Sequence, residues 1–245
     1  MALEVEALEQ DEQVAPAQKQ GLRHRIIRAV LIALLVFLFG PYLLILLYRI
    51  DFVRPVSTLM LADLATFQGY DRRWVDFEDI SPNVVKAVMM SEDGQYCNHG
   101  GVDWNQLQSV IDDAMAGEAT RGASTIPMQT AKNLFLWEGR SYVRKGLEAW
   151  FTVVLELCLP KDRILDLYLN LAEWGDGVFG AEMAARTHFK KSAKNLTRDE
   201  AARLAAVLPS PRKWSPKGSI ASRRASGIIQ RMQYPAPHPE DLVKK

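Results

Sequence analysis

The chain has 245 residues, 48% of them hydrophobic and 24% charged, with a formal net charge of +1. The balanced charge argues against a nucleic-acid-binding surface. Two cysteines, Cys97 and Cys158, are too few for a disulfide framework, and we expect both to be small buried apolar residues.

An uncharged run of twenty residues, from Ala29 to Tyr48, marks the N-terminal part of the chain. At about 1.5 Å of rise per residue, a helix of this length spans roughly 30 Å, the thickness of the bilayer hydrocarbon core. Arg23, Arg25 and Arg28 precede the run, so the positive-inside rule predicts a cytoplasmic N-terminus. A cleaved signal peptide has a shorter apolar core and an Ala-x-Ala-like cleavage site. Neither is found, so we expect an uncleaved anchor.

The chain after this run is long enough for one domain with its own hydrophobic core. The first twenty residues are acidic and polar and have little to bury, which is typical of a disordered segment. We therefore expect a cytoplasmic tail at 1–25, a transmembrane helix at 26–49, a juxtamembrane connector at 50–79, the main domain at 80–234 and a C-terminal tail at 235–245.

The connector contains an apolar segment of its own, made by Leu59, Met60, Leu61, Leu64 and Phe67. Such a face suits either contact with lipid or a place in the core of the domain. The sequence does not decide between these two interpretations.

Helical periodicity dominates the main domain, and no convincing series of alternating strand residues is found. Ser81 before Pro82 predicts the start of a helix that runs to about Glu92. Thr197 and Glu200 form a capping box at the start of another helix, which ends before the next proline. Further helices are expected over Trp104–Ala116, Tyr142–Leu159, Asp162 to a stop at Gly175, Phe179–Phe189 and Ile220–Met232.

Two carboxylates, Glu92 and Glu148, are candidate catalytic groups. Glu92 falls at the C-terminal end of its helix, where the macrodipole disfavours negative charge and raises a carboxyl pKa towards the range of a general base. The alternative is that Glu92 and Asp93 form a solvated acidic pair. Glu148 follows Arg144 by four residues and Lys145 by three, so it is either half of an exposed ion pair or a second active-site carboxylate.

The segment 122–133, with the sequence GASTIPMQTAKN, is predicted to be a loop that grips a polar, negatively charged ligand. Its small residues come first, then hydroxyls, an amide and the single cation Lys132. An ammonium suits phosphate, and Arg140 and Arg144 add fork-shaped donors nearby. The alternative is a loop that leads into a helix, with cations that face water.

Two further patterns carry less weight. His99 has no second His or Cys pair at metal-ligand spacing, so we expect a structural or hydrogen-bonding role and no metal site. Ser210-Pro211-Arg212-Lys213 matches the Ser-x-x-Lys pattern of penicillin-binding enzymes, but no Ser-Asp-Asn or Lys-Thr-Gly element follows it. We interpret that match as chance.

Five motifs occur in order between about Ile80 and Pro216. They contain Glu92-Asp93 and His99; Gly122 to Ile126, Gln129 and Lys132-Asn133; Arg144-Lys145 and Glu148; Lys161 and Ile164 to Asn170; and Gly180-Ala181, Phe189 and Lys191. Together they resemble the monofunctional biosynthetic peptidoglycan transglycosylases of glycosyltransferase family fifty-one, which also supplies the first catalytic domain of bifunctional penicillin-binding proteins. Tyr96, Pro127-Met128 and Asp166 depart from the family pattern, but none of them removes a residue that the family's mechanism needs.

The resemblance implies a mostly α-helical, lysozyme-like domain with a smaller lobe near the membrane. It implies an enzyme that polymerises lipid II, the undecaprenyl-diphosphate-linked GlcNAc–MurNAc-pentapeptide, into β-1,4 glycan strands, with inversion at MurNAc C1 and release of undecaprenyl diphosphate. Glu92 would take the proton of the acceptor hydroxyl. Glu148 would assist departure of the diphosphate through a proton, a metal ion or placement of the cations. No cofactor is required, and a divalent Mg or Mn ion is permitted.

The same resemblance implies the remaining site residues, the partners and the location. The substrate-binding residues would be Ser124, Thr125, Gln129, Lys132, Asn133, Arg140 and Arg144, with Asp93 and His99 in support. The partners would be lipid II, the growing glycan strand and the bilayer, with division or elongation proteins as further candidates and no nucleic acid. The protein would cross the inner membrane once, with its N-terminus in the cytoplasm and its catalytic domain in the periplasm.

Two rival functions stay open. A lysozyme-like enzyme that cleaves glycan strands also needs an acidic residue, but it has no diphosphate to hold, so the cations Lys132, Arg140 and Arg144 count against it. A catalytically inert scaffold of the cell-wall machinery could lose its acids, yet Glu92 and Glu148 are both present.

Overall fold

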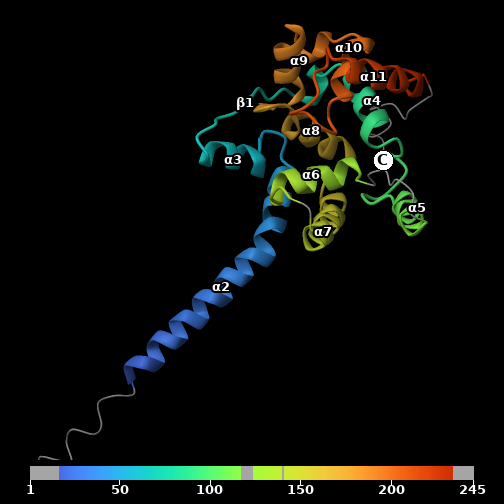
Figure 1. Ribbon diagram of the computed structural model, residues 1–245. Coiled ribbons are helices and arrows are strands. Elements are labelled where there is room, and N and C mark those ends of the chain that lie inside the picture. Colours follow the sequence, from blue (N-terminus) through green and yellow to red (C-terminus); the bar gives the residue numbers. More distant parts are fainter. Residues whose placement is uncertain (1–16, 117–123, 140, 234–245) are drawn as a thin grey trace, which may run out of the picture. The chain divides into compact units, whose positions relative to one another are not determined.

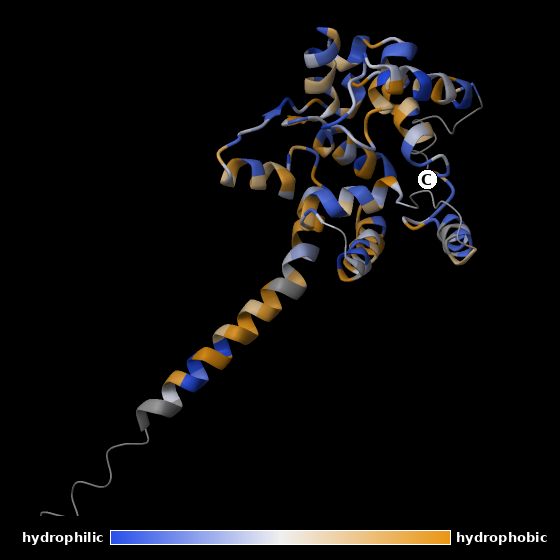
Figure 2. Ribbon diagram, viewed as in Figure 1, coloured by the Kyte–Doolittle hydropathy of each residue, from blue (hydrophilic) through white to orange (hydrophobic). Residues whose placement is uncertain are grey.

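The computed structural model describes residues 17–116, 124–139 and 141–233. It divides the chain into two units, residues 1–44 and 45–245. The first contains most of helix α2 (Ala17–Tyr48), and side chains along it such as Leu31 and Leu35 are exposed. Gly21–Tyr48 is apolar and long enough to cross a membrane, and Figure 2 shows the middle of α2 as hydrophobic. The helix is therefore a candidate membrane span, as the sequence predicts.

The second unit is mostly helical, which confirms the predicted fold class (Figure 1). The expected segments 50–79 and 80–234 both fall within this compact unit, so the boundary between them stays a prediction. Its elements are α3 (Thr58–Ala65), η1 (Phe77–Asp79), α4 (Pro82–Glu92), α5 (Trp104–Met115), α6 (Ile126–Phe135), α7 (Tyr142–Cys158), α8 (Lys161–Leu171), α9 (Ala181–Phe189), η2 (Ala193–Asn195), α10 (Arg198–Ala205) and α11 (Ser219–Arg231).

The core joins helices that lie far apart in the sequence. Helix α4 packs against α10 and α11, and α6 packs against α7 and α8. Val84 and Val88 of α4 are fully buried beside Leu169 of α8 and Ala202 of α10. Because small alanines face the larger side chains, these helices can approach closely.

A small sheet interrupts the helical pattern, and here the sequence prediction is wrong. The strand order is β1 (Asp71–Arg72), β3 (Val178–Phe179), β2 (Glu173–Gly175), with β1 parallel and β2 antiparallel to β3. Helix α8 therefore ends at Leu171 and not at Gly175. The Gly180 N–H closes the hairpin on the carbonyl of Ala172 at 2.9 Å. Strands of two or three residues are too short to show alternation, and pairing with the distant β1 supports them.

The second correction concerns residues 126–135, which form helix α6 and not the predicted loop. Thr125 accepts the Met128 N–H at 3.3 Å, and Pro127 lies in the first turn, both of which favour a helix start. Gln129 and Lys132 therefore project from a rigid helix. Gly122 and Ala123, which open the predicted loop, lie outside the described residues.

Most of the apolar segment of the connector lies in α3, and its side chains differ in burial. Met60 is fully buried, whereas Leu61, Leu64 and Phe67 are exposed. Only part of the segment belongs to the core, and contact of the exposed residues with lipid stays a prediction. Cys97 and Cys158 are both half-buried, so the expectation that both are buried is wrong. Neither forms a disulfide within the described chain.

Candidate active site

Glu92 is the last residue of α4, and its partly buried carboxylate accepts two hydrogen bonds. Ser91 Oγ donates to Oε1 at 3.0 Å, and Gln129 Nε2 donates to Oε2 at 3.1 Å. Burial raises the pKa of Glu92, and these two bonds oppose the rise because they stabilise the charged form. The upward direction expected from the sequence is found, with burial as its main cause.

Tyr168 fixes the amide that touches Glu92. Its hydroxyl on α8 donates to Gln129 Oε1 at 3.1 Å, which turns the amide nitrogen of Gln129 towards the carboxylate. The three side chains come from α8, α6 and α4, so packing of these helices sets the orientation of the carboxylate.

Asp93 and His99 have a supporting position next to Glu92. The buried carboxylate of Asp93 pairs with His99 Nε2 at 2.8 and 3.0 Å. Its Oδ2 also accepts the N–H of Ile126, the first residue of α6, at 3.0 Å. Asp93 therefore ties the end of α4 to the start of α6, where the helix dipole favours a negative charge.

Thr125 and Gly101 fix the segment that follows Asp93. The hydroxyl of Thr125 donates to the carbonyl of Gly101 at 2.5 Å. Gly101 has a φ of +88°, and a Cβ there would lie 2.7 Å from Cγ of Glu156 on α7. Because its hydroxyl caps α6 and holds Gly101, Thr125 has a structural role, and its expected contact with substrate stays a prediction.

Glu148 is buried on α7, so the interpretation as an exposed ion pair is wrong. Its carboxylate pairs with Arg144 and, at 2.7 Å, with Lys145 Nζ. The same ammonium donates to Ser124 Oγ at 2.7 Å. Glu156, another acid on this helix, pairs with Lys161 at 2.8 Å.

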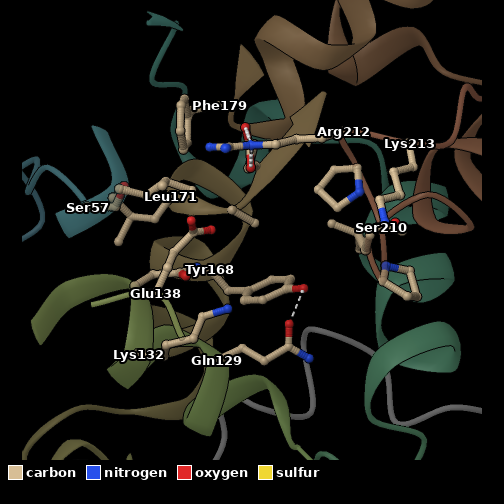
Figure 3. Close-up of a pocket in the computed structure, with 17 residues that line it drawn as sticks. Ser57, Gln129, Lys132, Glu138, Tyr168, Leu171, Phe179, Ser210, Arg212 and Lys213 are labelled. Atoms are coloured by element: carbon tan, nitrogen blue, oxygen red, sulfur yellow. Dashed lines mark hydrogen bonds and ion pairs between the residues drawn. The ribbon is translucent and has the colours of Figure 1, made fainter. Parts of the chain in front are cut away.

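A polar cavity of about 360 Å³ is lined in part by Gln129 and Tyr168 (Figure 3). Lys132 lies on its wall, and burial lowers the pKa of the Lys132 ammonium, against the opposing influence of Glu148. Among the described residues no carboxylate lies within ion-pairing distance of Lys132. The cavity is lined by Ser57, Leu59, Gln129, Lys132, Asn133, Glu138, Tyr168, Leu171, Ala172, Glu173, Phe179, Leu208, Pro209, Ser210, Pro211, Arg212 and Lys213.

The structure gathers only some of the predicted substrate-binding residues in this cavity. Gln129, Lys132 and Asn133 line it. Ser124, Thr125 and Arg144 are absent from its lining, as are the two candidate catalytic carboxylates, although Gln129 connects Glu92 to the cavity wall. Arg140 lies outside the described residues.

A family model described as Transglycosylase matches residues 60–233. A biosynthetic peptidoglycan transglycosylase of Agrobacterium fabrum (strain C58 / ATCC 33970) is 56% identical over 205 residues, 83% of this chain and 91% of that protein. A protein of the same name from Brucella suis biovar 1 (strain 1330) is 58% identical over 171 residues, 70% of this chain and 76% of that protein. The chain belongs to the transglycosylase family. It is an enzyme, and the resemblance carried by the five motifs is confirmed.

Sequence reasoning missed most residues of this transglycosylase cavity, among them Tyr168, Glu173, Arg212 and Lys213. Tyr168 was part of an apolar stripe and looked like a core residue, and Glu173 fell inside the helix that was predicted to run from Asp162 to Gly175. Arg212 and Lys213 stood out only as part of a Ser-x-x-Lys pattern. Two cations bracketed by prolines in a loop were the available signal, because such a turn holds side chains on a rigid backbone.

The transglycosylase site has no metal cluster in the described parts of the chain, residues 17–116, 124–139 and 141–233. No three His, Cys, Asp or Glu side chains converge there in a way that could hold an ion. The divalent cation that the sequence permits therefore stays a prediction.

Proposed function

We propose that this transglycosylase polymerises lipid II into β-1,4 glycan strands of peptidoglycan and releases undecaprenyl diphosphate. Family membership and the printed names of the relatives support the reaction class. The observation that carries the proposal is a partly buried cation, Lys132, in a cavity joined through Gln129 to a carboxylate of raised pKa, Glu92. This cation pairs with no carboxylate among the described residues.

In the proposed reaction Glu92 is the general base. It takes the proton from the 4-OH of the acceptor GlcNAc while that oxygen attacks C1 of the donor MurNAc with inversion. A carboxylate whose pKa is raised by burial accepts a proton more readily than an ordinary one, which suits abstraction from a neutral hydroxyl. Gln129 keeps the acceptor oxygen of Glu92 oriented before the sugar arrives.

Lys132 stabilises the leaving group. Departure of a lipid diphosphate develops negative charge on the bridging oxygen, and a preorganised cation that is partly shielded from water stabilises such charge strongly. Burial lowers the pKa of Lys132, and a bound anion favours its charged form. Arg212 and Lys213 add two further cations to the lining of the cavity.

Glu148 places the cations in this proposal. Of the three roles considered for it, proton donor, metal ligand and holder of cations, its pairing with Arg144 and Lys145 supports the third. Lys145 in turn holds Ser124 at the start of the segment that leads into α6. We infer that Glu148 fixes the entry to the donor site without exchanging a proton.

The cavity favours synthesis over the rival functions. A glycan-cleaving enzyme has no anionic leaving group, so it has no use for an ammonium held in the cavity wall without a carboxylate partner in the described chain. An inert scaffold has no use for a carboxylate of raised pKa that is joined through Gln129 to the cavity of that ammonium. The partners in this proposal are lipid II, the growing strand and the bilayer, with division or elongation proteins as further candidates.

We further propose that the enzyme crosses the inner membrane once through α2, with its N-terminus in the cytoplasm and its catalytic domain in the periplasm. The cluster of arginines before the apolar run supports this orientation. Anchoring in the bilayer that holds the lipid substrate raises the effective concentration of that substrate.

The test is incubation of the purified full chain with labelled lipid II in detergent, with wild type beside Glu92→Gln. We expect lysozyme-sensitive strands from wild type and a loss of about 10²- to 10⁴-fold in the variant, because the amide cannot take the proton. Retained lipid II binding and an unchanged melting temperature would show that the variant is folded. Equal turnover by both proteins would remove Glu92 as the base, and shortening of preformed strands by wild type would favour the cleaving enzyme.

A further inference from the structure

The guanidinium of Arg212 lines the cavity and is held on one side by the carboxylate of Glu173. Arg212 Nε donates to both carboxylate oxygens of Glu173, at 2.9 and 3.1 Å. Asp63 Oδ1 lies 3.8 Å from Nη2 of the same guanidinium. Helix α3, strand β2 and the turn after α10 therefore meet at one side chain.

The two acids are buried, but the cation is not. The side chains of Glu173 and Asp63 are each 8% exposed, whereas that of Arg212 is 40% exposed. Oδ2 of Asp63 is buried with no hydrogen-bond partner among the described residues. Burial of a carboxylate is unfavourable, and a buried ion pair adds little to the net stability of a fold. We therefore look for a functional reason why Glu173 and Asp63 surround Arg212.

The contact with Glu173 leaves Nη1 and Nη2 of Arg212 without hydrogen bonds in the described chain. Within the described chain only Nε of Arg212 donates a hydrogen bond. Asp63 Oδ1, at 3.8 Å from Nη2, is too far away to accept one, so the N–H groups of Nη1 and Nη2 remain available. These two groups form the fork that binds phosphate oxygens. Figure 3 shows Arg212 and Lys132 on opposite sides of the cavity.

We propose that Glu173, assisted by Asp63, is a positioning residue that fixes Arg212 so that its two Nη groups face the ligand opposite Lys132. The inference rests on the proposed function, since the ligand is the diphosphate of the lipid-linked donor. A half-exposed arginine loses rotamer freedom when it binds an anion, and a side chain held in place beforehand loses less. Glu173 reduces the positive charge at the rim, so its contribution is geometry and not attraction.

The test is a double-mutant cycle in the full chain, with steady-state kinetics on labelled lipid II in detergent. Glu173→Gln should raise KM about tenfold with a smaller change in kcat, because ground-state binding of the diphosphate loses its ordered partner. Arg212→Ala should raise KM at least as much. In the Arg212→Ala background, Glu173→Gln should have no further effect, because Glu173 acts only through Arg212.

Asp176→Asn is the matched control. Asp176 Oδ1 also lies 3.8 Å from Arg212 Nε, but its side chain is 84% exposed and makes no hydrogen bond to the guanidinium. This variant should keep the KM of wild type. If Glu173→Gln melts below the assay temperature, Asp63→Asn takes its place in the cycle, with a smaller rise in KM that should again vanish without Arg212.

The positioning role is overturned if the effects of Glu173→Gln and Arg212→Ala add, if Glu173→Gln behaves like Asp176→Asn, or if it lowers KM. These results differ from failure of the proposed function. That failure would show as no polymerisation by wild type, or as normal kinetics of Lys132→Ala. Wild-type polymerisation with impaired Lys132→Ala and Arg212→Ala but normal Glu173→Gln would reject the positioning role alone.

Discussion

At the scale of single residues, the chemistry depends on a carboxylate and an ammonium whose ordinary pKa values are both changed by burial. The pKa of Glu92 is raised and that of Lys132 is lowered, so both charged forms are less favourable than in water. Gln129 lies between them, because it donates to Glu92 and lines the cavity of Lys132. In the proposed reaction, an anionic ligand at Lys132 and an acceptor hydroxyl at Glu92 supply the partners that these two groups need.

The pH dependence of turnover follows from Glu92. A general base acts only when deprotonated, so kcat/KM should fall as pH falls through the pKa of Glu92, at a pH above the ordinary value of 4.5. Gln129→Leu removes a donor that stabilises the charged form, so the acidic limb should move to higher pH. Rates on lipid II across a pH series measure this shift. A limb that stays in place, or moves down, would separate Gln129 from the titration of the base.

Lys132→Ala should lower kcat/KM on lipid II by about 10- to 100-fold, because the leaving diphosphate loses a partly buried cation. Lys194→Ala removes an exposed ammonium that pairs with Asp79, and it should leave turnover unchanged. Steady-state rates of both variants beside wild type give the comparison. Equal rates for all three proteins would contradict the assignment of Lys132.

At the scale of elements, the segment between α4 and α5 sets the distance between Glu92 and α7. Asp93 binds the first N–H of α6, and Thr125 at the start of α6 binds the carbonyl of Gly101. Gly101 then packs directly against side chains of α7. Side chains of Asp93 and Thr125 thus connect α4, α6 and the segment between α4 and α5, and the close approach of this segment to α7 requires a glycine at position 101.

Gly101→Ala should lower the free energy of unfolding by about 1–3 kcal/mol, because φ is +88° and the new Cβ would lie 2.7 Å from Glu156 and 2.8 Å from Thr152. Gly100→Ala is the matched control, since nothing lies within 4 Å of the place that its new methyl group would take and its φ is ordinary. Thermal melts of both variants in detergent measure the difference. Equal melting temperatures would show that side chains of α7 move to accommodate the new methyl group without loss of stability.

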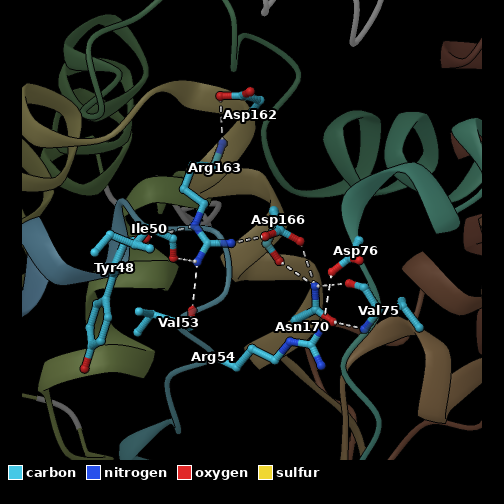
Figure 4. A network of polar contacts seen from close by, with 10 residues as sticks. All are labelled: Tyr48, Ile50, Val53, Arg54, Val75, Asp76, Asp162, Arg163, Asp166 and Asn170. Atoms are coloured by element: carbon cyan, nitrogen blue, oxygen red, sulfur yellow. Dashed lines mark hydrogen bonds and ion pairs between the residues drawn. The ribbon is translucent and has the colours of Figure 1, made fainter.

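At the scale of the whole molecule, a buried network ties the segment after α2 to the catalytic core (Figure 4). Arg163 on α8 donates to the carbonyls of Tyr48 at 2.8 Å, Ile50 at 3.1 Å and Val53 at 2.8 Å. It also pairs with Asp166 at 2.5 Å, although burial raises the pKa of Asp166 to about 6. One guanidinium thus donates to the carbonyls of Tyr48 and Val53. The carbonyl of Ile50 also accepts the backbone N–H of Val53 at 3.0 Å, so Arg163 is its second donor.

Arg163→Met should destabilise the protein by about 3 kcal/mol or more, because Asp166 loses its counter-charge and the carbonyls of Tyr48 and Val53 lose their donor. Hydrogen exchange of residues 48–53 should rise and the melting temperature should fall. Arg54→Ala is the control, since its pair with Asp76 is exposed and should contribute less than about 1 kcal/mol. If the two substitutions destabilise the protein equally, the network of Arg163 does not stabilise the fold more than an exposed ion pair does.

The sequence alone determined the features that depend on near neighbours in the chain. The apolar run of α2, the caps at Ser81 and Thr197 and the periodicity of α7 are local patterns, so the order of residues was enough to predict them. The same holds for Glu92 at a helix end. The family follows from five ordered motifs, because motif spacing is also a property of the chain itself.

Only the tertiary structure decided which of these residues meet. Helix α6 was hidden because a glycine and hydroxyl residues precede it in the sequence. The small sheet exists because β1 pairs with residues about a hundred positions away. The spacing of Glu148 from Arg144 and Lys145 also allowed an exposed ion pair, and only the packing of α7 shows that the Glu148 carboxylate is buried. The grip of Glu173 on Arg212 joins segments that are distant in sequence. Burial and long-range pairing depend on how helices pack, which no local pattern records.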